Sequence, residues 1–172
     1  MIINIFTDAS VNNQSHNAGY AFYIGCRGHK LQRAGVLKVK TKSTVQAELQ
    51  AIINAVFILR RSNLPKPDKL VIHTDSMECI KMLTGVQQSP HDHGLRMQFE
   101  ECQLLILDYM QFLCLPVYTY RKFVEFKHVK AHTGDKSKHS LINRWCDLES
   151  RRYRELQDEA DGYRVKKRPN RR

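Results

Sequence analysis

Two short, mostly apolar segments of this chain each lead into an aspartate that a small residue follows. The first is Ile2–Phe6, which continues through Thr7 into Asp8, and the second is Leu70–Thr74, which continues into Asp75. Both segments have strand character, and sites in α/β proteins form beyond the carboxyl ends of parallel strands. We therefore predict that Asp8 and Asp75 lie side by side at the ends of adjacent parallel strands.

Two further acids fall in helical patterns. Glu48 belongs to a helix predicted over residues 43–62, which starts with a capping box at Ser43. Asp147 belongs to a final helix predicted over residues 141–161. Carboxylates gathered where buried elements meet the surface are costly unless they share a cation. The sequence therefore predicts a metal site formed by Asp8, Glu48, Asp75 and Asp147.

Each of the four acids also has a purely structural explanation. Asp8 could be an edge residue of its strand, and Asp75 could cap the helix that follows it. Glu48 lies at the margin of the apolar stripe of its helix, where solvated glutamates are frequent. Asp147 falls away from the expected packing side of its helix, which carries Leu141, Trp145 and Leu148.

The order of elements predicts a mixed α/β fold. Three strands joined by short turns, at residues 2–8, 19–24 and 31–40, indicate an antiparallel meander. Two later strands, at residues 70–74 and 117–129, should pair parallel to the first. We expect a mixed five-stranded sheet flanked by helices, and further helices over residues 43–62, 76–83, 95–113 and 141–161.

Composition limits the class of protein. The 172 residues are enough for one domain, which we expect over residues 1–162, and no apolar run approaches the length of a membrane span. The amino terminus lacks the features of a secretory signal, and the five cysteines show no CxxC pairing. We therefore expect an intracellular monomer without membrane attachment, disulfide framework or zinc ribbon.

The net charge of +11 favours a polyanionic partner such as nucleic acid. Six of the basic residues lie in the segment 163–172, which we expect to be a disordered tail. This tail could serve as a non-specific nucleic-acid arm or as a localisation signal that directs the protein to the nucleus.

Five motifs in order resemble the type 1 ribonuclease H family and cover about residues 1–160. They are Thr7-Asp8-Ala9-Ser10, Ala47-Glu48-Leu49, Thr74-Asp75-Ser76, His128-Val129-Lys130-Ala131-His132-Thr133-Gly134 and Asn143-Arg144-Trp145-Cys146-Asp147. Short pieces such as these are weak signals alone, but five of them in the family's order are specific. The resemblance implies the ribonuclease H-like fold and hydrolysis of the RNA strand of RNA–DNA hybrids.

The resemblance also implies a role for each residue. Asp8 would bridge two Mg²⁺ ions, for which Mn²⁺ could substitute, while Glu48 and Asp75 would help to hold one ion and Asp147 the other. His132 would assist proton transfer or product departure, for which a near-neutral pKa is suited. Candidate contacts to the hybrid are Ser10, Ser43, Thr44, Met77 and Asn143.

The chain departs from the family in three places. Thr44 and Val45 stand where family members often have Asn and Gln, so hydrogen bonds to the minor groove would be weaker or redistributed. The spacing from His132 to Asp147 is longer than usual, which affects the reach of His132. The single tryptophan, Trp145, leaves no Trp-rich basic protrusion to grip the hybrid.

Two other functions are compatible with this class of sequence. A catalytically silent nucleic-acid-binding module of the same fold is disfavoured because all four acids and the histidine are present. A recombinase or exonuclease is disfavoured by the position of the glutamate, which lies on the first long helix, and by the Asp8-Ala9-Ser10 sequence that ends the first strand.

Overall fold

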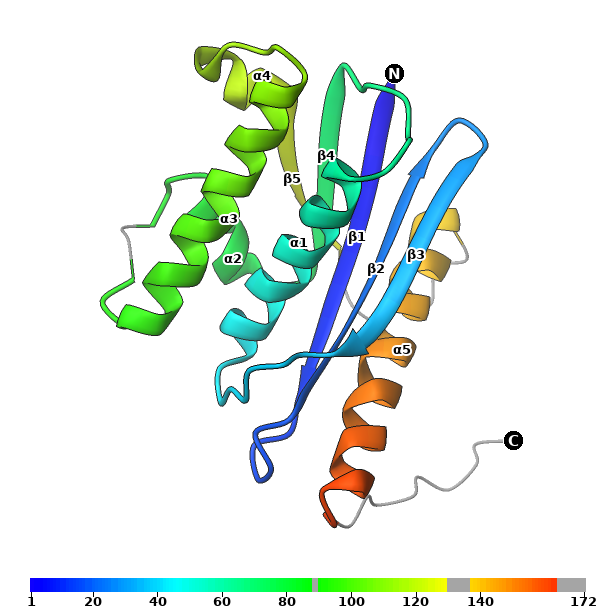
Figure 1. Ribbon diagram of the computed structural model, residues 1–172, viewed down its shortest axis with the longest axis vertical. Helices are drawn as coiled ribbons and strands as arrows, with labels where there is room; N and C mark the ends of the chain where they lie inside the picture. Colours follow the sequence, from blue (N-terminus) through cyan, green and yellow to red (C-terminus); the bar gives the residue numbers. More distant parts are fainter. Residues whose placement is uncertain (88–89, 130–136, 164–172) are drawn as a thin grey trace.

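A computed structural model describes residues 1–87, 90–129 and 137–163. Its sheet has five strands in the order β3-β2-β1-β4-β5 (Figure 1). β1 is antiparallel to β2 and parallel to β4, while β2 pairs antiparallel with β3 and β4 pairs parallel with β5. The strands are β1 (Ile2–Val11), β2 (Ala18–Cys26), β3 (His29–Val36), β4 (Lys69–Thr74) and β5 (Val124–His128). This mixed five-stranded sheet confirms the predicted fold class.

Helices cover both faces of the sheet (Figure 1). α1 packs on β1, β2 and α3, whereas α5 packs on the opposite face against β1, β2 and β3. The main core lies between the sheet and the helices on the α1 side, α1 to α4. A smaller cluster around Phe6, Ala21 and Cys146 lies under α5. The helices are α1 (Thr44–Arg60), α2 (Met77–Leu83), α3 (His93–Phe112), α4 (Tyr120–Phe123) and α5 (Lys138–Ala160), with a 3-10 turn at Val117–Thr119.

Side-chain caps set where these helices begin. The Ser43 hydroxyl accepts a hydrogen bond from the Gln46 amide at 3.2 Å, so the predicted cap of α1 is confirmed. Asp92 caps α3 in the same way, and Ser137 caps α5. Both helices therefore start two or three residues earlier than predicted, because the capping residue precedes the first apolar position that the sequence pattern reveals.

The prediction of one strand over residues 117–129 was wrong in its first half. Pro116 is followed by a helical turn in which the Thr119 hydroxyl donates to the Pro116 carbonyl oxygen at 2.6 Å. Only Val124–His128 forms a strand. Tyr118, within this turn, is 87% exposed. The β-rich composition of this segment was overridden by the turn after the proline.

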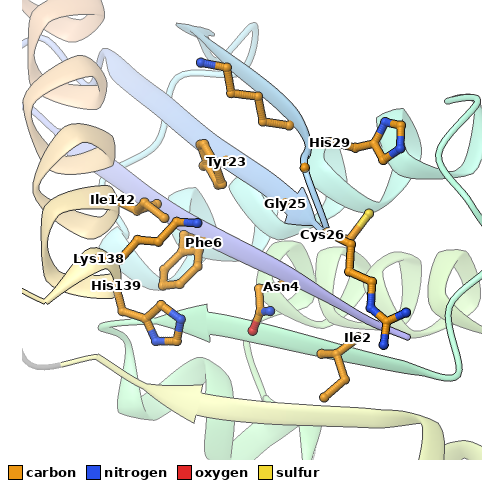
Figure 2. Close-up of a pocket in the computed structure, with 13 residues that line it drawn as sticks. Ile2, Asn4, Phe6, Tyr23, Gly25, Cys26, His29, Lys138, His139 and Ile142 are labelled. Carbon is orange, nitrogen blue, oxygen red and sulfur yellow. The ribbon is translucent and has the colours of Figure 1, made fainter.

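α5 lies unusually close to the sheet at Gly19. A Cβ atom at this position of β2 would lie 2.0 Å from the Ser150 carbonyl oxygen and 2.7 Å from the Arg154 amide nitrogen. Glycine is therefore required for the helix backbone to reach the strand. The helix starts beside Phe6 and leaves Ile2 and Asn4, on the same face of β1, uncovered (Figure 2).

Within the described parts of the chain, no single helix combines the length and hydropathy needed to cross a bilayer. α3 and the segment Val117–Phe123 meet that criterion only jointly, with a bend of 112° between them. All five cysteines are free, as predicted, and four of them are buried.

Candidate active site

Asp8 lies on the α5 side of β1, the central strand, and is only 5% exposed. It is therefore not an edge residue. The buried Ser150 hydroxyl donates a hydrogen bond to Asp8 Oδ2 at 2.5 Å. The close approach of α5 at Gly19 brings Ser150 to this position, so one oxygen of the carboxylate is fixed by the helix.

Glu48 lies on the buried face of α1 rather than at its margin, and is 6% exposed. Its Oε1 accepts a hydrogen bond from the Ala9 amide at 2.9 Å, and its Oε2 lies 3.4 Å from the Thr74 hydroxyl. These contacts tie the carboxylate to the carboxyl ends of β1 and β4. A solvated glutamate is excluded.

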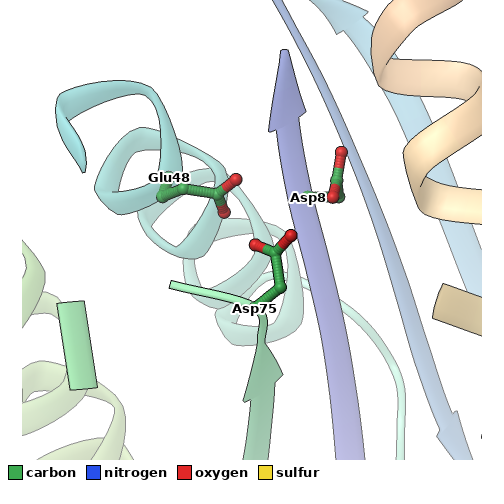
Figure 3. Close-up of side chains that lie close together, drawn as sticks. All are labelled: Asp8, Glu48 and Asp75. Atoms are coloured by element: carbon green, nitrogen blue, oxygen red, sulfur yellow. The ribbon is translucent and has the colours of Figure 1, made fainter. Parts of the chain in front are cut away.

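Asp75 directly follows β4 and is half-buried. Ser76, not Asp75, caps α2, because its hydroxyl accepts from the Cys79 amide at 3.2 Å. One carboxylate oxygen from each of Asp8, Glu48 and Asp75 lies within 4.8 Å of the other two. Figure 3 shows the three side chains converging from a strand, a helix and the end of the neighbouring strand.

Burial and mutual repulsion make these acids expensive to ionise. The pKa of Asp8 is raised from 3.8 to about 7, chiefly by burial; the Ser150 hydrogen bond acts against this rise, while the charges of Asp75 and Asp147 add to it. Burial also raises the pKa of Glu48 well above its ordinary value, and the Asp8 and Asp75 charges reinforce that shift. A nearby cation would reverse both effects.

The donor set suits a divalent cation. Carboxylate oxygens are hard ligands, and Mg²⁺ takes one or two of them together with water and substrate phosphate. The oxygens of three carboxylates lie close together, and the pKa values of two of these groups are strongly raised. A bound cation would therefore offset a large electrostatic cost of ionising them. The residues therefore fit the predicted metal.

Asp147 does not belong to this close group, but its charge contributes to the raised pKa of Asp8. Its Oδ1 forms an ion pair of 2.6 Å with Arg151 Nη2. The expected packing side of α5 was wrong for Leu141 and Leu148, which are exposed, whereas Trp145 packs on the cluster under the helix. The buried residues of the helix near the site are Asn143, Cys146 and Ser150. Asp147 is half-buried beside this docking face.

The candidate hybrid contacts lie around the same end of the sheet. Ser10, at the end of β1, is half-buried and accepts a hydrogen bond from Arg154 Nη1 at 3.1 Å. Thr44 and Met77 are exposed at the starts of α1 and α2, and Ser43 is engaged in its cap. Asn143 is buried, and its Oδ1 has no hydrogen-bond partner among the described residues.

His132 lies outside the described residues, as does the tail from residue 164 onward. At the described end of β5, His128 Nε2 lies 3.1 Å from the Asp75 carbonyl oxygen, next to the acidic group. The sequence reasoning missed Ser150. Its spacing of seven residues from Asn143 and three from Asp147 on one helix was the available signal.

The order of the strands, the two helical layers and the acids at the ends of β1 and β4 define a ribonuclease H-like α/β protein. The family model for RNase H matches residues 2–154, and the chain belongs to that family. No curated protein sequence matches the chain.

Solved structures with low sequence identity share the fold. RNase H1 from Halobacterium salinarum NRC-1 aligns with a TM-score of 0.64 at 17% identity, covering 92% of this chain and 99% of that one. LC11-RNase H1, solved in complex with an RNA/DNA hybrid, aligns with a TM-score of 0.67 at 16% identity, covering 90% and 98%. An N-terminal RNase H domain from Mycobacterium tuberculosis aligns with a TM-score of 0.69 at 12% identity, covering 93% and 98%.

Proposed function

We propose that this protein is an endoribonuclease that hydrolyses the RNA strand of RNA–DNA hybrids with divalent metal ions. The observation that carries this proposal is the convergence of carboxylate oxygens from Asp8, Glu48 and Asp75 within 4.8 Å of one another. Membership of the RNase H family supports it, as does the hybrid bound by the similar LC11-RNase H1. The net charge of +11 suits a nucleic-acid substrate.

Asp8, Glu48 and Asp75 would hold Mg²⁺, with Asp147 contributing from α5. Two bound ions would supply an attacking water of lowered pKa and would stabilise the leaving 3′-oxygen. Glu48 is held for this task by the Ala9 amide, and Asp8 by the Ser150 hydroxyl. These fixed carboxylates form one wall of the site, so the substrate phosphate would approach from the solvent side of Asp75.

The surrounding polar groups would select the hybrid. RNA is distinguished from DNA through 2′-hydroxyl groups in a wide, shallow minor groove. The Oδ1 of Asn143, which has no hydrogen-bond partner in the described part of the chain, could accept from such a hydroxyl, and Ser10, Thr44 and Met77 lie around the same end of the sheet. His132 would assist proton transfer or product departure. We further propose that the protein acts as an intracellular monomer.

One gel tests the proposal. Labelled single-stranded RNA, duplex RNA and an RNA–DNA hybrid are each incubated with Mg²⁺, with Mn²⁺ and with chelator. We expect cleavage of the hybrid alone, and only with metal. Asp75→Asn should abolish it, whereas Asp108→Asn, an exposed acid on α3 paired with Arg60, should not. Hybrid binding without cleavage in either metal would instead identify a catalytically silent module.

A second assay tests His132. His132→Ala should slow turnover by roughly 10²-fold or less, which is the contribution of a general acid–base group. His16→Ala, in the turn between β1 and β2, is the matched control. Equal rates for both variants would remove His132 from the mechanism while leaving the metal site in place.

A further inference from the structure

A cavity large enough for a small ligand lies on the part of the sheet that α5 leaves uncovered. A cavity of about 390 Å³ lies across β1 and β2 at Asn4 and Gly25, next to the first turn of α5 (Figure 2). Its floor is the strand backbone together with Phe6, and Ile142 of α5 closes one side. We call this cavity the α5-side trough.

The charge of the trough is of one sign. Three cationic side chains line it: Arg27 from the turn between β2 and β3, Lys30 from β3 and Lys138 from the start of α5. His29 and His139 also line it, and among the described residues that do, none is an aspartate or glutamate. Cations brought together from separate elements without a local acid favour an anionic ligand.

An aromatic ring lies along one wall. A Cβ atom at Gly25 would lie 2.7 Å from Tyr23 Cε1, so this glycine lets the Tyr23 ring lie along the strand. Phe6 meets the ring edge-on, with centroids 6.5 Å apart and planes at 69°. Phe6 is itself stacked on His73 at 4.1 Å, which fixes its orientation. Tyr23 is half-buried and lines the cavity.

We propose that the α5-side trough binds single-stranded nucleic acid, with a base on Tyr23 and phosphates at Arg27, Lys30 and Lys138. An aromatic ring beside several cations is the combination that binds single strands without sequence preference, through stacking and backbone charge. A cavity of about 390 Å³ lies within the range that accommodates a small organic group such as one nucleotide.

An acidic peptide fits the trough less well. Extended peptides usually add to a free sheet edge, through main-chain hydrogen bonds. β1 and β2, which form the floor, are paired on both sides and offer no such edge. A ligand that lies over β1 and β2 would therefore be recognised by side chains, as the phosphates and bases of a single strand are.

The trough is distinct from the acidic site. Asn4 and Asp8 lie on the same side of β1, four residues apart, which corresponds to about 13 Å along a strand. Phe6 lies between them along β1, and α5 contacts it through His139 and Cys146. Binding in the trough needs no metal and does not depend on cleavage, so it can be tested separately from the proposed function.

The test is fluorescence anisotropy of labelled oligo(dT) and oligo(rU) with the full chain in chelator. We expect saturable binding that weakens with salt. The variant Arg27→Gln/Lys30→Gln/Lys138→Gln should lower the log–log salt slope by about 2, because three single-strand phosphate contacts are lost. Arg61→Gln/Lys66→Gln/Lys81→Gln, with the same loss of charge on other exposed residues, should change the slope by less than half as much.

Tyr23 gives an independent measurement. Tyr23→Leu should weaken binding roughly fivefold or more at unchanged salt slope, as expected for one stacked base, and Tyr23→Phe should bind as the wild type does. Far-UV circular dichroism and cleavage of a blunt hybrid confirm that each variant is folded. Absence of saturable binding, or equal effects of the two triple variants, overturns the proposal. Loss of hybrid cleavage in the wild type would overturn only the proposed function.

Discussion

The two ends of the α5 side of β1 present opposite chemistry within a few residues. At the carboxyl end, the Asp8 carboxylate lies close to those of Glu48 and Asp75. Toward the amino end, Asn4 borders the α5-side trough, whose charged lining residues are Lys, Arg and His. Phe6 separates the two regions. α5 covers the acidic end closely and leaves the basic end open.

Burial has the same kind of effect on Asp8, at the acidic end, and on His73, which is stacked on Phe6 between the two regions, but the consequences differ. Desolvation disfavours charge, so it raises the pKa of Asp8 to about 7 and lowers the pKa of His73, which is stacked on Phe6, to about 4. His73 can remain neutral at physiological pH without loss. At the acidic end, the charges of Asp8 and Asp75 raise the pKa of Glu48 further, and a shared cation would relieve that repulsion. The contrast explains why the acidic end, and not His73, is the candidate metal site.

The largest effect should come from Asp8→Asn. Removing one carboxylate should reduce hybrid cleavage by about 10³-fold or more, since several kcal/mol of transition-state stabilisation depend on the metals. Without metal, the same change should raise the melting temperature because it relieves repulsion. Thermal unfolding with Mg²⁺ and with chelator measures both. Glu149→Gln, on the same helix as Asp147, is the control. A lower melting temperature in chelator would make Asp8 a structural residue.

The local signals in the sequence were sufficient for much of this site. The strand that carries Asp8, the strand end before Asp75 and the cap at Ser43 follow from short-range patterns that the tertiary structure did not override, although β1 continues to Val11 and not only to Asp8 as predicted. The order of elements then placed the first and fourth strands side by side. The two aspartates and Glu48 therefore converge as expected.

The remaining features depend on contacts between distant segments. The docking side of α5 is decided by Gly19, 131 residues before Ser150, and an apolar pattern cannot reveal that a helix docks through Asn143, Cys146 and Ser150. The residues that line the α5-side trough come from β1, β2, β3 and α5. The helical turn after Pro116 was missed because the β-branched and aromatic residues there favour a strand.

The pH dependence of stability distinguishes the contribution of Asp8 from that of His73. With chelator, the Asp8 contribution is fully present below about pH 4, where the side chain is protonated in both states, and is lost as the pH rises toward 7. His73 acts in the opposite direction: its contribution is present above pH 6.5 and is lost as the pH falls toward 4. Each amounts to a few kcal/mol, on the order of 1.4 kcal/mol per pKa unit.

Denaturant unfolding of the wild type, Asp8→Asn and His73→Gln across this range measures each contribution as a difference. The wild type should lose stability relative to Asp8→Asn as the pH rises from 4 to 7, and should gain it relative to His73→Gln as the pH rises from 4 to 6.5. Saturating Mg²⁺ should flatten the first difference and leave the second unchanged. A Mg²⁺ effect on the His73 difference would show that His73 is coupled to the acidic site.

A smaller effect is expected at Ser150, which holds Asp8 from the helix. Ser150→Ala removes a hydrogen bond to a carboxylate, worth about 1.5–3 kcal/mol, and should lower cleavage roughly tenfold at limiting Mg²⁺. The half-saturating Mg²⁺ concentration should rise, and excess metal should restore most of the rate. Ser140→Ala, in the first turn of α5, is the control. An equal loss at all Mg²⁺ concentrations would mean that Ser150 does not act through the metal site.

The smallest effect should come from Asn143, between the two regions. Its buried Oδ1 has no partner within the described chain, and an unsatisfied acceptor costs about 1–3 kcal/mol. Asn143→Ala should therefore leave the free energy of unfolding unchanged or raise it by about 1 kcal/mol, while KM for the hybrid rises several-fold. Asn63→Ala, on an exposed loop, should change neither. If Asn143→Ala clearly destabilises the protein without affecting KM, then Asn143 supports the docking of α5 and does not contact the substrate.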